Sequence, residues 1–340
     1  MDFGMNASIA GGLLFAAAAT SAVLILLLHG LLQRYALARP NARSSHHEPT
    51  PQGGGIAVIA ATLGLAAVFL GLLGGEIPRE LWPVFAATAF LACVGAVDDI
   101  WVIPVAPRLF LQAAAIALVI AFLPWDLRIV SILPSWVERA LLLLGGLWFV
   151  NLVNFMDGID WMTVAEVVAI SFGVILIGIF GGLPVYATVL AIALCGAILG
   201  FAPFNRPVAR LFLGDVGSLP IGLLLGWLLL VVARQGYMAA AVLLPLYYLA
   251  DATITLARRL RSGETLWKAH RMHFYQRALD GGFTVLQIVG PVVAVNFVLV
   301  ALALATVIVP HIVVIVAALA LGAIVVAWLL VSFERGRRGA

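Results

Sequence analysis

The segment from Asn151 to Asp160 places two carboxamides and two carboxylates at the end of an otherwise apolar run. Asn151, Asn154 and Asp157 follow one another at intervals of three residues, which keeps them on one stripe of a helix. Oxygen-bearing side chains at this spacing suit a hard cation, and ionisable groups at membrane depth are functional by default. The segment therefore predicts a divalent metal site that serves a phosphorylated substrate.

Further acidic residues lie at or near the ends of other apolar runs: Asp98 with Asp99, Asp215, and Asp251. Neighbouring helical residues point about 100° apart, so one carboxylate of the Asp98–Asp99 pair can hold a metal while the other meets a second group. Asp215 lies in a glycine-containing turn, where backbone amides and a carboxylate can share a phosphate–Mg²⁺ unit. A solvated loop for the pair and a plain turn at Asp215 stay open as alternatives.

Three glycines, Gly53, Gly54 and Gly55, follow a proline-rich turn and begin an apolar run. Their backbone N–H groups can approach a phosphate closely. Close helix packing is the alternative explanation for glycines at such a position.

The polar segment 257–282 contains His270, Arg271, His273, Phe274 and Tyr275. Two histidines three residues apart could bind zinc, but both cysteines of the chain lie within apolar runs and no paired ligand motif accompanies the histidines. The basic groups are better suited to an anionic diphosphate, with Tyr275 or Phe274 beside a base.

The composition indicates a polytopic all-α membrane protein. Of the 340 residues, 64% are hydrophobic and 10% are charged, and the mean hydropathy is +1.14. Eleven apolar runs predict about eleven transmembrane helices: 8–32, 54–73, 81–97, 109–122, 140–153, 163–180, 185–204, 219–232, 239–256, 284–309 and 311–332. We expect one transmembrane domain over 1–340, whose site is formed by the loops 33–53, 98–108, 154–162, 205–218 and 257–282.

The basic residues predict an N-out, C-in orientation. This orientation leaves only Arg79, Arg128, Arg139 and Arg234 outside, so fifteen of the nineteen Lys and Arg residues face the cytoplasm. The same orientation places every acidic motif on the cytoplasmic face. The net charge of +3 is then explained by anionic lipid headgroups and an anionic substrate, with no nucleic-acid partner.

Some residues are expected to be structural. Cys93 and Cys195 lie within apolar runs and are interpreted as small buried hydrophobic residues, and Glu166 as a structural polar residue. Asp251 lies within the ninth run, where we expect it to pair with Arg258 and to support folding.

Five motifs in order resemble the polyprenyl-phosphate N-acetylhexosamine-1-phosphate transferases of glycosyltransferase family 4. The motifs are Pro49-Thr-Pro-Gln-Gly-Gly-Gly55, Gly95-Ala-Val-Asp98-Asp99, Asn151-x-x-Asn154-x-x-Asp157-Gly-Ile-Asp160, Asn205-Arg-Pro207 leading to Phe212-x-Gly-Asp215-x-Gly-Ser218, and His270-x-x-His273-x-Tyr275-Gln276. The last motif is most similar to the O-antigen-initiating branch, while the peptidoglycan branch has a histidine-rich run there.

The resemblance implies transfer of an N-acetylhexosamine 1-phosphate from a UDP-sugar to undecaprenyl phosphate, releasing UMP, with Mg²⁺ or Mn²⁺ as cofactor. It places the enzyme in the bacterial inner membrane, where it would begin an O-antigen-like glycan. Asp157 and Asp215, with Asn154, would hold the metal and diphosphate. Asp98 would be the base for the lipid phosphate, and Asp99 would support the metal or the acceptor.

By the same resemblance, His270, Arg271 and His273 would hold the diphosphate of the nucleotide sugar. The other expected substrate-binding residues are Gly53, Gly54, Asn151, Asn205 and Tyr275. Two positions depart from the family pattern: Ile100-Trp101-Val102 stands where many members have a third acidic residue, and Asp160-Trp161-Met162 replaces the usual Asp-Gly-Leu.

Other functions stay open as alternatives. Phospho-MurNAc-pentapeptide translocase activity belongs to the same family, and a multi-pass transporter would also carry buried carboxylates. A transporter, however, is expected to place them near midspan in broken or repeated helices. The sequence leaves open the identity of the N-acetylhexosamine, the glycan that is begun and the formation of a homodimer.

Overall fold

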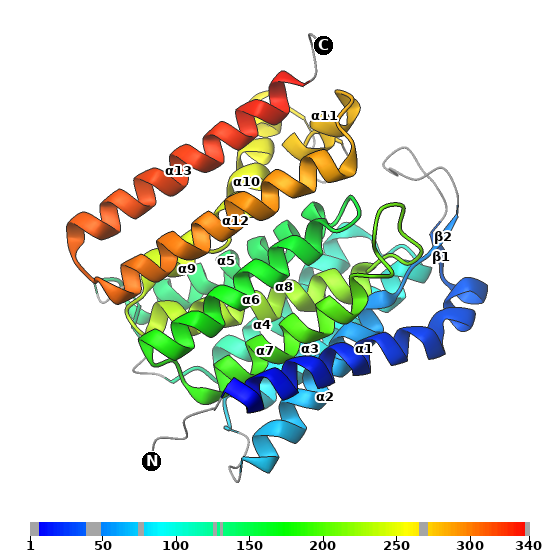
Figure 1. The fold of residues 1–340 in the computed structure, drawn as a ribbon, viewed down its shortest axis with the longest axis horizontal. Coiled ribbons are helices and arrows are strands. Elements are labelled where there is room, and N and C mark those ends of the chain that lie inside the picture. The colour runs from blue at the N-terminus through cyan, green and yellow to red at the C-terminus, as the bar shows by residue number, and fades with distance from the viewer. Residues whose placement is uncertain are drawn as a thin grey trace.

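The computed structural model describes residues 7–38, 49–73, 78–124, 128–129, 132–264 and 271–336. The chain is almost entirely helical (Figure 1). The helices are α1 (Ala7–Tyr35), α2 (Gly54–Leu72), α3 (Leu81–Ile100), α4 (Val105–Ala121), α5 (Ser135–Met156), α6 (Met162–Gly181), α7 (Val185–Phe201), α8 (Asp215–Arg234), α9 (Met238–Leu243), α10 (Leu246–Arg261), α11 (Phe274–Asp280), α12 (Val285–Ile308) and α13 (Ile312–Arg335). Strands β1 (Leu37–Ala38) and β2 (Thr50–Pro51) pair antiparallel.

The predicted polytopic all-α class is confirmed. Within the described residues, eight helices are long and apolar enough to cross a membrane, namely α1, α2, α3, α5, α6, α8, α12 and α13, while α4 and α7 are shorter apolar helices. Each predicted apolar run coincides with a helix except the ninth, which is divided into α9 and α10. Pro245 stands at the division, because proline lacks the N–H that a continuous helix requires. The number of spans and the orientation stay predictions.

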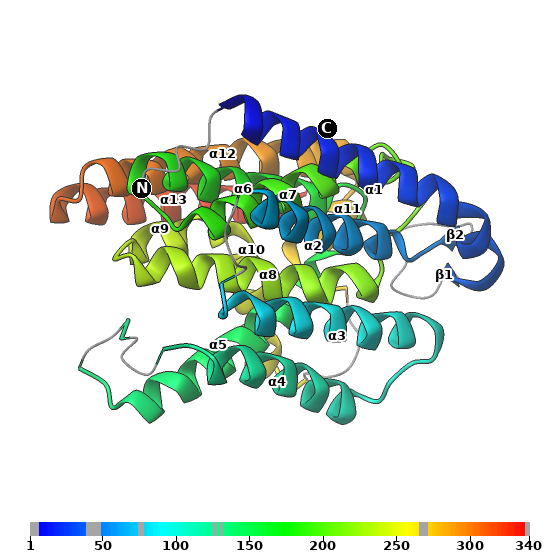
Figure 2. The ribbon, with the colours of Figure 1, turned by 90° about the horizontal axis from the view of Figure 1, so that it is seen from below.

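Helix α8 forms the centre of the bundle. It packs against α2, α3, α5, α6 and α9, and Figure 2 shows it between the layer of α3, α4 and α5 and the layer that contains α6 and α7. In its most apolar stretch 83% of the residues are buried, against 22% in α1 and in α13. A helix surrounded by protein can hold its first residue in a fixed position, and in α8 that residue is Asp215.

The predicted site loops meet at one end of the bundle. Strands β1 and β2, helix α11 and the C-terminal end of α13 lie at that end, in the upper right of Figure 1. The C-terminal end of α5 and the start of α8 are joined there by the side chains of Asn154 and Asp215. The chain therefore brings its acidic motifs together, as their shared position relative to the spans predicts.

The residues expected to be structural include one wrong prediction. Cys195 is buried, but Cys93 is exposed on α3. An apolar run in a membrane protein also presents residues to lipid, so lying within such a run does not imply burial by protein. Glu166 is fully buried and its Oε2 accepts a hydrogen bond of 2.7 Å from Asn296, which joins α6 to α12 as a structural contact.

Candidate active site

Asp99 holds the start of α8 in place from α3. Its Oδ1 accepts a hydrogen bond from the backbone N–H of Asp215 at 2.9 Å, and its Oδ2 accepts one from Val216 at 3.1 Å. The first N–H groups of a helix have no partner within the helix, so a carboxylate from elsewhere can satisfy them. Asp99 thereby fixes the position of Asp215. Its predicted role as a metal ligand stays untested.

Glycines allow α2 and α3 to approach this helix start. A Cβ atom on Gly95 would lie 2.2 Å from the carbonyl oxygen of Asp215, and one on Gly55 would lie 2.2 Å from Cα of Gly217. The N–H of Gly54, predicted to approach a phosphate, instead donates to the carbonyl of Phe212 at 2.9 Å. The structure thus favours close packing, the alternative explanation for these glycines.

Gly53 serves the turn that precedes α2. Its φ of 107° is in the left-handed region, which glycine adopts without strain. The neighbouring side chain of Gln52 donates to the carbonyl of Asp99 at 2.7 Å, so this turn also supports the end of α3. A direct contact of Gly53 with substrate stays a prediction.

Asn154 joins the motif at the end of α5 to the motif at the start of α8. Its amide nitrogen donates to Oδ1 of Asp215 at 2.7 Å and to the hydroxyl of Ser218 at 2.8 Å. Two predicted site residues from separate helices, Asp99 of α3 and Asn154 of α5, therefore both contact Asp215 at the start of α8.

Asp157 follows immediately after α5 and is half-buried beside this group. Its Oδ1 accepts a hydrogen bond of 2.5 Å from the hydroxyl of Thr163. The pKa of Asp157 is raised to about 7, chiefly because burial desolvates the carboxylate; the Thr163 hydrogen bond lowers this pKa, while the nearby charges of Asp215 and Asp160 contribute to the rise. The group accordingly gathers negative charge that a divalent cation would neutralise.

The donor set fits Mg²⁺. Within the part of the chain that the structure describes, no three His, Cys, Asp or Glu side chains form a ready metal site. Mg²⁺ is usually held by one or two carboxylates together with substrate phosphates, so a complete protein cage is not required. Asp157 and Asp215 supply hard oxygen donors of this kind, and Asn154 orients Asp215.

Arg108 is a functional candidate that the sequence analysis missed. Its Nη1 lies 2.9 Å from Oδ2 of Asp98 and 3.8 Å from Oδ2 of Asp215. Oδ1 of Asp98 accepts a hydrogen bond of 2.6 Å from the N–H of Ile103, so the predicted base is held on both oxygens. The sequence could have indicated this residue, because Arg108 is a single arginine just before the apolar run 109–122 and lies ten residues after Asp98.

Asn151 is more deeply buried than Asn154 and Asp157 of the same motif. It is 6% exposed, and its amide nitrogen donates to Oε1 of Gln112 at 2.7 Å and to the carbonyl of Leu147 at 2.8 Å. The predicted role in substrate binding is therefore not favoured, because Asn151 instead joins α5 to α4.

The loop between α7 and α8 is attached to the turn that follows Asp157. Oδ1 of Asn205 accepts from the N–H of Trp161 at 2.8 Å, while its Nδ2 donates to the carbonyl of Leu211 at 3.1 Å. Oδ2 of Asp160 accepts from the N–H of Ala209 at 3.0 Å. These contacts give Asn205 and Asp160 a positioning role, and a contact of Asn205 with substrate stays a prediction.

Trp161 explains one departure from the family pattern. Its φ of 62° lies in the left-handed region, where the usual glycine at this place carries no steric cost. Its indole N–H donates to the carbonyl of Ala202 at 2.8 Å, a contact that glycine cannot make. The tryptophan thus accepts backbone strain and attaches the loop more firmly.

Asp251 does not pair with Arg258, so that prediction is wrong. Its carboxylate accepts from the N–H groups of Phe274 at 3.1 Å and Tyr275 at 3.3 Å, and lies 3.1 Å from Nδ1 of His273. Arg258 pairs instead with Glu334. The carboxylate reaches forward to the start of α11, which supports the expected role of Asp251 in folding.

Arg258 contacts Glu334 of α13 at 2.9 Å. Its guanidinium also lies 4.6 Å from the ring centroid of Phe274. Phe274 is 3% exposed, so the ring expected beside a base is covered by the fold in this arrangement.

Helix α11 rests on the end of α5 through Tyr275. The side chain is fully buried, its hydroxyl donates to the carbonyl of Phe155 at 3.0 Å, and a Cβ on Gly158 would lie 2.0 Å from that hydroxyl oxygen. Burial raises the pKa of Tyr275 well above its usual value, so the hydroxyl stays protonated as a donor. Tyr275 therefore braces the acidic motif, and its predicted place beside a base is untested.

Two of the three predicted diphosphate ligands, His273 and Arg271, lie within the described residues. His273 is 4% exposed and faces Asp251, and Arg271 contacts Asp280 at 3.0 Å. His270 lies outside the described residues. The binding of a diphosphate by these side chains stays a prediction.

Known proteins are similar to this chain over the helices that carry the site. The family model for glycosyl transferase family 4 matches residues 81–233, which extend from the start of α3 almost to the end of α8. The undecaprenyl-phosphate alpha-N-acetylglucosaminyl 1-phosphate transferase of Escherichia coli K12 is 30% identical over 272 residues, covering 72% of this chain and 70% of the relative.

Two further relatives extend the comparison. The decaprenyl-phosphate N-acetylglucosaminephosphotransferase of Mycolicibacterium smegmatis is 29% identical over 281 residues, covering 73% of this chain and 69% of the relative. The probable undecaprenyl-phosphate N-acetylglucosaminyl 1-phosphate transferase of Bacillus subtilis is 22% identical over 285 residues, covering 78% of this chain and 76% of the relative.

Proposed function

Because the chain belongs to glycosyl transferase family 4, we propose that it transfers the sugar 1-phosphate of a UDP-N-acetylhexosamine to undecaprenyl phosphate and releases UMP. The observation that carries the proposal is the meeting of Asp99, Asn154 and Asp215 from α3, α5 and α8 at one end of a membrane bundle. Such a site can be reached by a phosphate anchored in lipid and by a charged nucleotide sugar from the aqueous side. The names of the three relatives all specify a polyprenyl phosphate and N-acetylglucosamine.

The reaction requires positioning and charge neutralisation more than covalent chemistry. A lipid phosphate oxygen attacks the sugar-bearing phosphorus of the UDP-sugar, and the bond to UMP breaks as UMP leaves with its electron pair. Asp157 and Asp215 would hold Mg²⁺, which supplies neutralisation of the phosphate charge. Arg108 carries a cation beside both Asp98 and Asp215 and is suited to a phosphate oxygen.

Asp98 is suited to receive a proton from a lipid phosphate that arrives as the monoanion. Its side chain is 5% exposed and its carboxylate is held by Ile103 and Arg108, so its orientation is fixed before the substrates bind. Asp99 acts through Asp215, which it positions at the start of α8. In this proposal the attacking group is the lipid phosphate itself, because that phosphate is already an oxyanion.

The finer assignment is an O-antigen-like glycan begun in the bacterial inner membrane. The pattern of residues 270–276 supports this branch, because the histidine-rich run of the peptidoglycan branch is absent from the sequence. The apolar helices support a multi-pass membrane location for the enzyme.

A substrate panel tests the proposal. Purified protein in neutral detergent would receive undecaprenyl phosphate, Mg²⁺ and each of a set of UDP-sugars, and released UMP would be measured. We expect UMP from a UDP-N-acetylhexosamine only when lipid phosphate is present, and none from the Asp215→Asn variant used as control. UMP release without lipid, or no release from any sugar, would contradict the proposal.

A further inference from the structure

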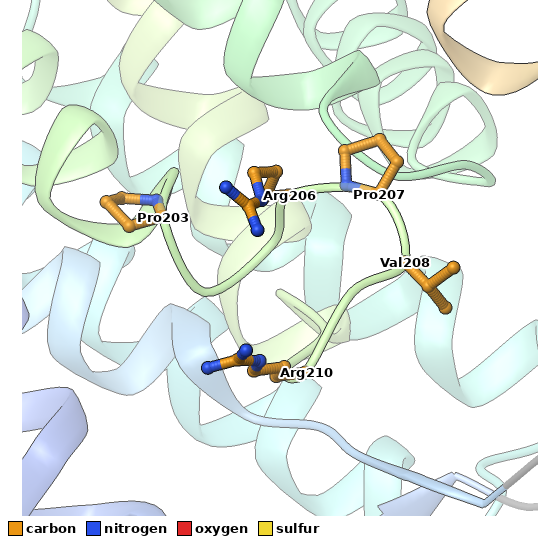
Figure 3. A pocket seen from close by; sticks show the side chains of 5 residues that line it. All are labelled: Pro203, Arg206, Pro207, Val208 and Arg210. Atoms are coloured by element: carbon orange, nitrogen blue, oxygen red, sulfur yellow. The ribbon is translucent and has the colours of Figure 1, made fainter.

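A pocket opens in the loop between α7 and α8, beside the acidic site and separate from its carboxylates. Its volume is about 430 Å³, and its walls are formed by Pro203, Arg206, Pro207, Val208 and Arg210 (Figure 3). Figure 3 shows both guanidinium groups extending toward the same side of the loop, while Val208 points the other way. Neither arginine has a role in the proposed mechanism.

Three arginines in or near α11 pair with carboxylates. Arg258 and Arg277 both contact Glu334, and Arg271 contacts Asp280. By contrast, the side chains of Arg206 and Arg210 are exposed, and within the described residues neither has a hydrogen-bond or ion-pair partner. Two positive charges thus border the hollow, and none of its described lining residues is acidic.

The loop is held firmly enough to keep this hollow open. Asn205 contacts Trp161 and Leu211, and Asp160 contacts the N–H of Ala209. The carbonyl of Phe204 accepts from the N–H groups of two residues across the loop, at 2.9 and 3.2 Å. The backbone that carries the arginines is therefore preorganised, and binding would cost little ordering of the main chain.

We propose that Arg206 and Arg210 form a binding pocket for a phosphate group. Each guanidinium offers five N–H donors in a planar fork that matches phosphate oxygens, and charge-assisted hydrogen bonds are the stronger class. Solvated surface arginines that obey the positive-inside rule would not require a pocket or a braced loop.

The phosphate can come from two sources. The loop joins the last residue of α7, Phe201, to the first residue of α8, Asp215, so it lies where helices leave the apolar layer and lipid headgroups gather. The same loop leads directly to Asp215, so a diphosphate of the nucleotide sugar is the second source. That second source rests on the proposed function, whereas the first does not.

Binding measurements on variants distinguish the sources. The test variant is Arg206→Ala with Arg210→Ala, the charge-retaining variant is Arg206→Lys with Arg210→Lys, and the matched control is Arg335→Ala, an exposed arginine on α13 outside the pocket. Circular dichroism would first establish that each variant has the helical content and melting curve of the wild type.

In the first arm, calorimetric titration in neutral detergent measures the binding of UDP and of inorganic pyrophosphate. Loss of charge-assisted contacts is expected to weaken binding about tenfold or more in the double alanine variant, partly recovered in the double lysine variant. In the second arm, the Tm of the protein is measured in nanodiscs of phosphatidylcholine alone and in nanodiscs that also contain phosphatidylglycerol. The difference is the rise in Tm that the anionic lipid gives. The double alanine variant should lose that rise if the ligand is a headgroup.

Weakened binding in the first arm assigns the pocket to a soluble phosphate compound, and loss of stabilisation in the second assigns it to lipid. The proposal is overturned if wild type, double alanine variant and Arg335→Ala behave alike in both arms. Neither arm measures turnover. A wild-type protein without activity would therefore contradict the proposed transferase function and would not affect the proposal of a phosphate-binding pocket.

Discussion

Helices α8 and α11 both begin with N–H groups that donate to an aspartate from an earlier helix. Asp99 accepts from the first two residues of α8 at 2.9 and 3.1 Å, and Asp251 accepts from the first two residues of α11 at 3.1 and 3.3 Å. In each case one carboxylate satisfies two groups that the helix itself leaves unpaired.

The surroundings of the two aspartates differ. Asp99 is half-buried and positions Asp215, whose carboxylate meets Asn154. Asp251 is fully buried and positions Tyr275, whose hydroxyl donates to the carbonyl of Phe155 at the end of α5. The same local contact therefore serves chemistry in one region and support in the other, and variants should separate turnover from folding accordingly.

The largest effect is expected at the residue that Asp99 positions. Asp215→Asn, and equally Asp157→Asn, should lower turnover by at least about 10²-fold, because one charge at a metal-centred transition state typically contributes a few kcal/mol. UMP release measures the change, and an unaltered melting curve is the control for folding. Retained turnover in either variant would show that the metal assignment is wrong.

The matching change in the second region should act on folding. Asp251→Asn replaces one of the two buried acceptor oxygens at the start of α11 with an NH2 group, and we expect the free energy of unfolding to fall by roughly 1–3 kcal/mol. Expression level and Tm measure this loss. Turnover per folded molecule should stay close to that of the wild type. If the variant folds normally but is as inactive as Asp215→Asn, Asp251 has a role in catalysis and the contrast with Asp99 is wrong.

Asp99→Asn should give a smaller loss of turnover than Asp215→Asn. An amide offers one acceptor oxygen, so one of the two backbone contacts is lost and Asp215 shifts, with turnover lowered about tenfold for each 1.4 kcal/mol. Kinetics at several Mg²⁺ concentrations give the measurement. A loss equal to that of Asp215→Asn, with a raised Mg²⁺ requirement, would make Asp99 a ligand instead of a positioning residue.

The smallest expected effect concerns pH. Because burial raises the pKa of Asp157 to about 7, the metal-free folded chain keeps this proton between its ordinary pKa and about 7. The unfolded chain loses it there, so stability from this group falls as pH rises through that window. Metal binding requires the carboxylate, so the Mg²⁺ concentration for half-maximal activity should rise about tenfold from pH 8 to pH 6. An Asp157→Asn variant whose Mg²⁺ requirement shows the same pH dependence would remove Asp157 as the cause.

The helices and the meeting of the motifs could be predicted from sequence because both follow from local pattern. Apolar runs of spanning length must form helices in lipid, and motifs at alternate helix ends share one side of the bundle. Asn154 and Asp215 are in contact as that reasoning requires, although 61 residues separate them.

The partners of individual side chains could not be predicted in this way. Arg108 reaches two carboxylates, and Asn151 meets Gln112, because α3, α4, α5 and α8 pack at particular depths and rotations. Sequence spacing suggested Arg258 as the partner of Asp251, whereas the structure brings the start of α11 there. Spacing along one helix describes neighbours on that helix, and these contacts join different elements.

Exchange of labelled UMP into the UDP-sugar tests the central claim most directly. The reaction breaks one phosphoanhydride and forms another, so its equilibrium constant should lie near unity and added UMP should drive it backwards. If lipid phosphate attacks directly at the site formed by Asp98, Asp157 and Asp215, label enters the UDP-sugar only when polyprenyl phosphate is present. Strong exchange in fully delipidated enzyme would instead indicate a covalent sugar-phosphoryl enzyme, and no exchange under any condition would contradict the transferase assignment.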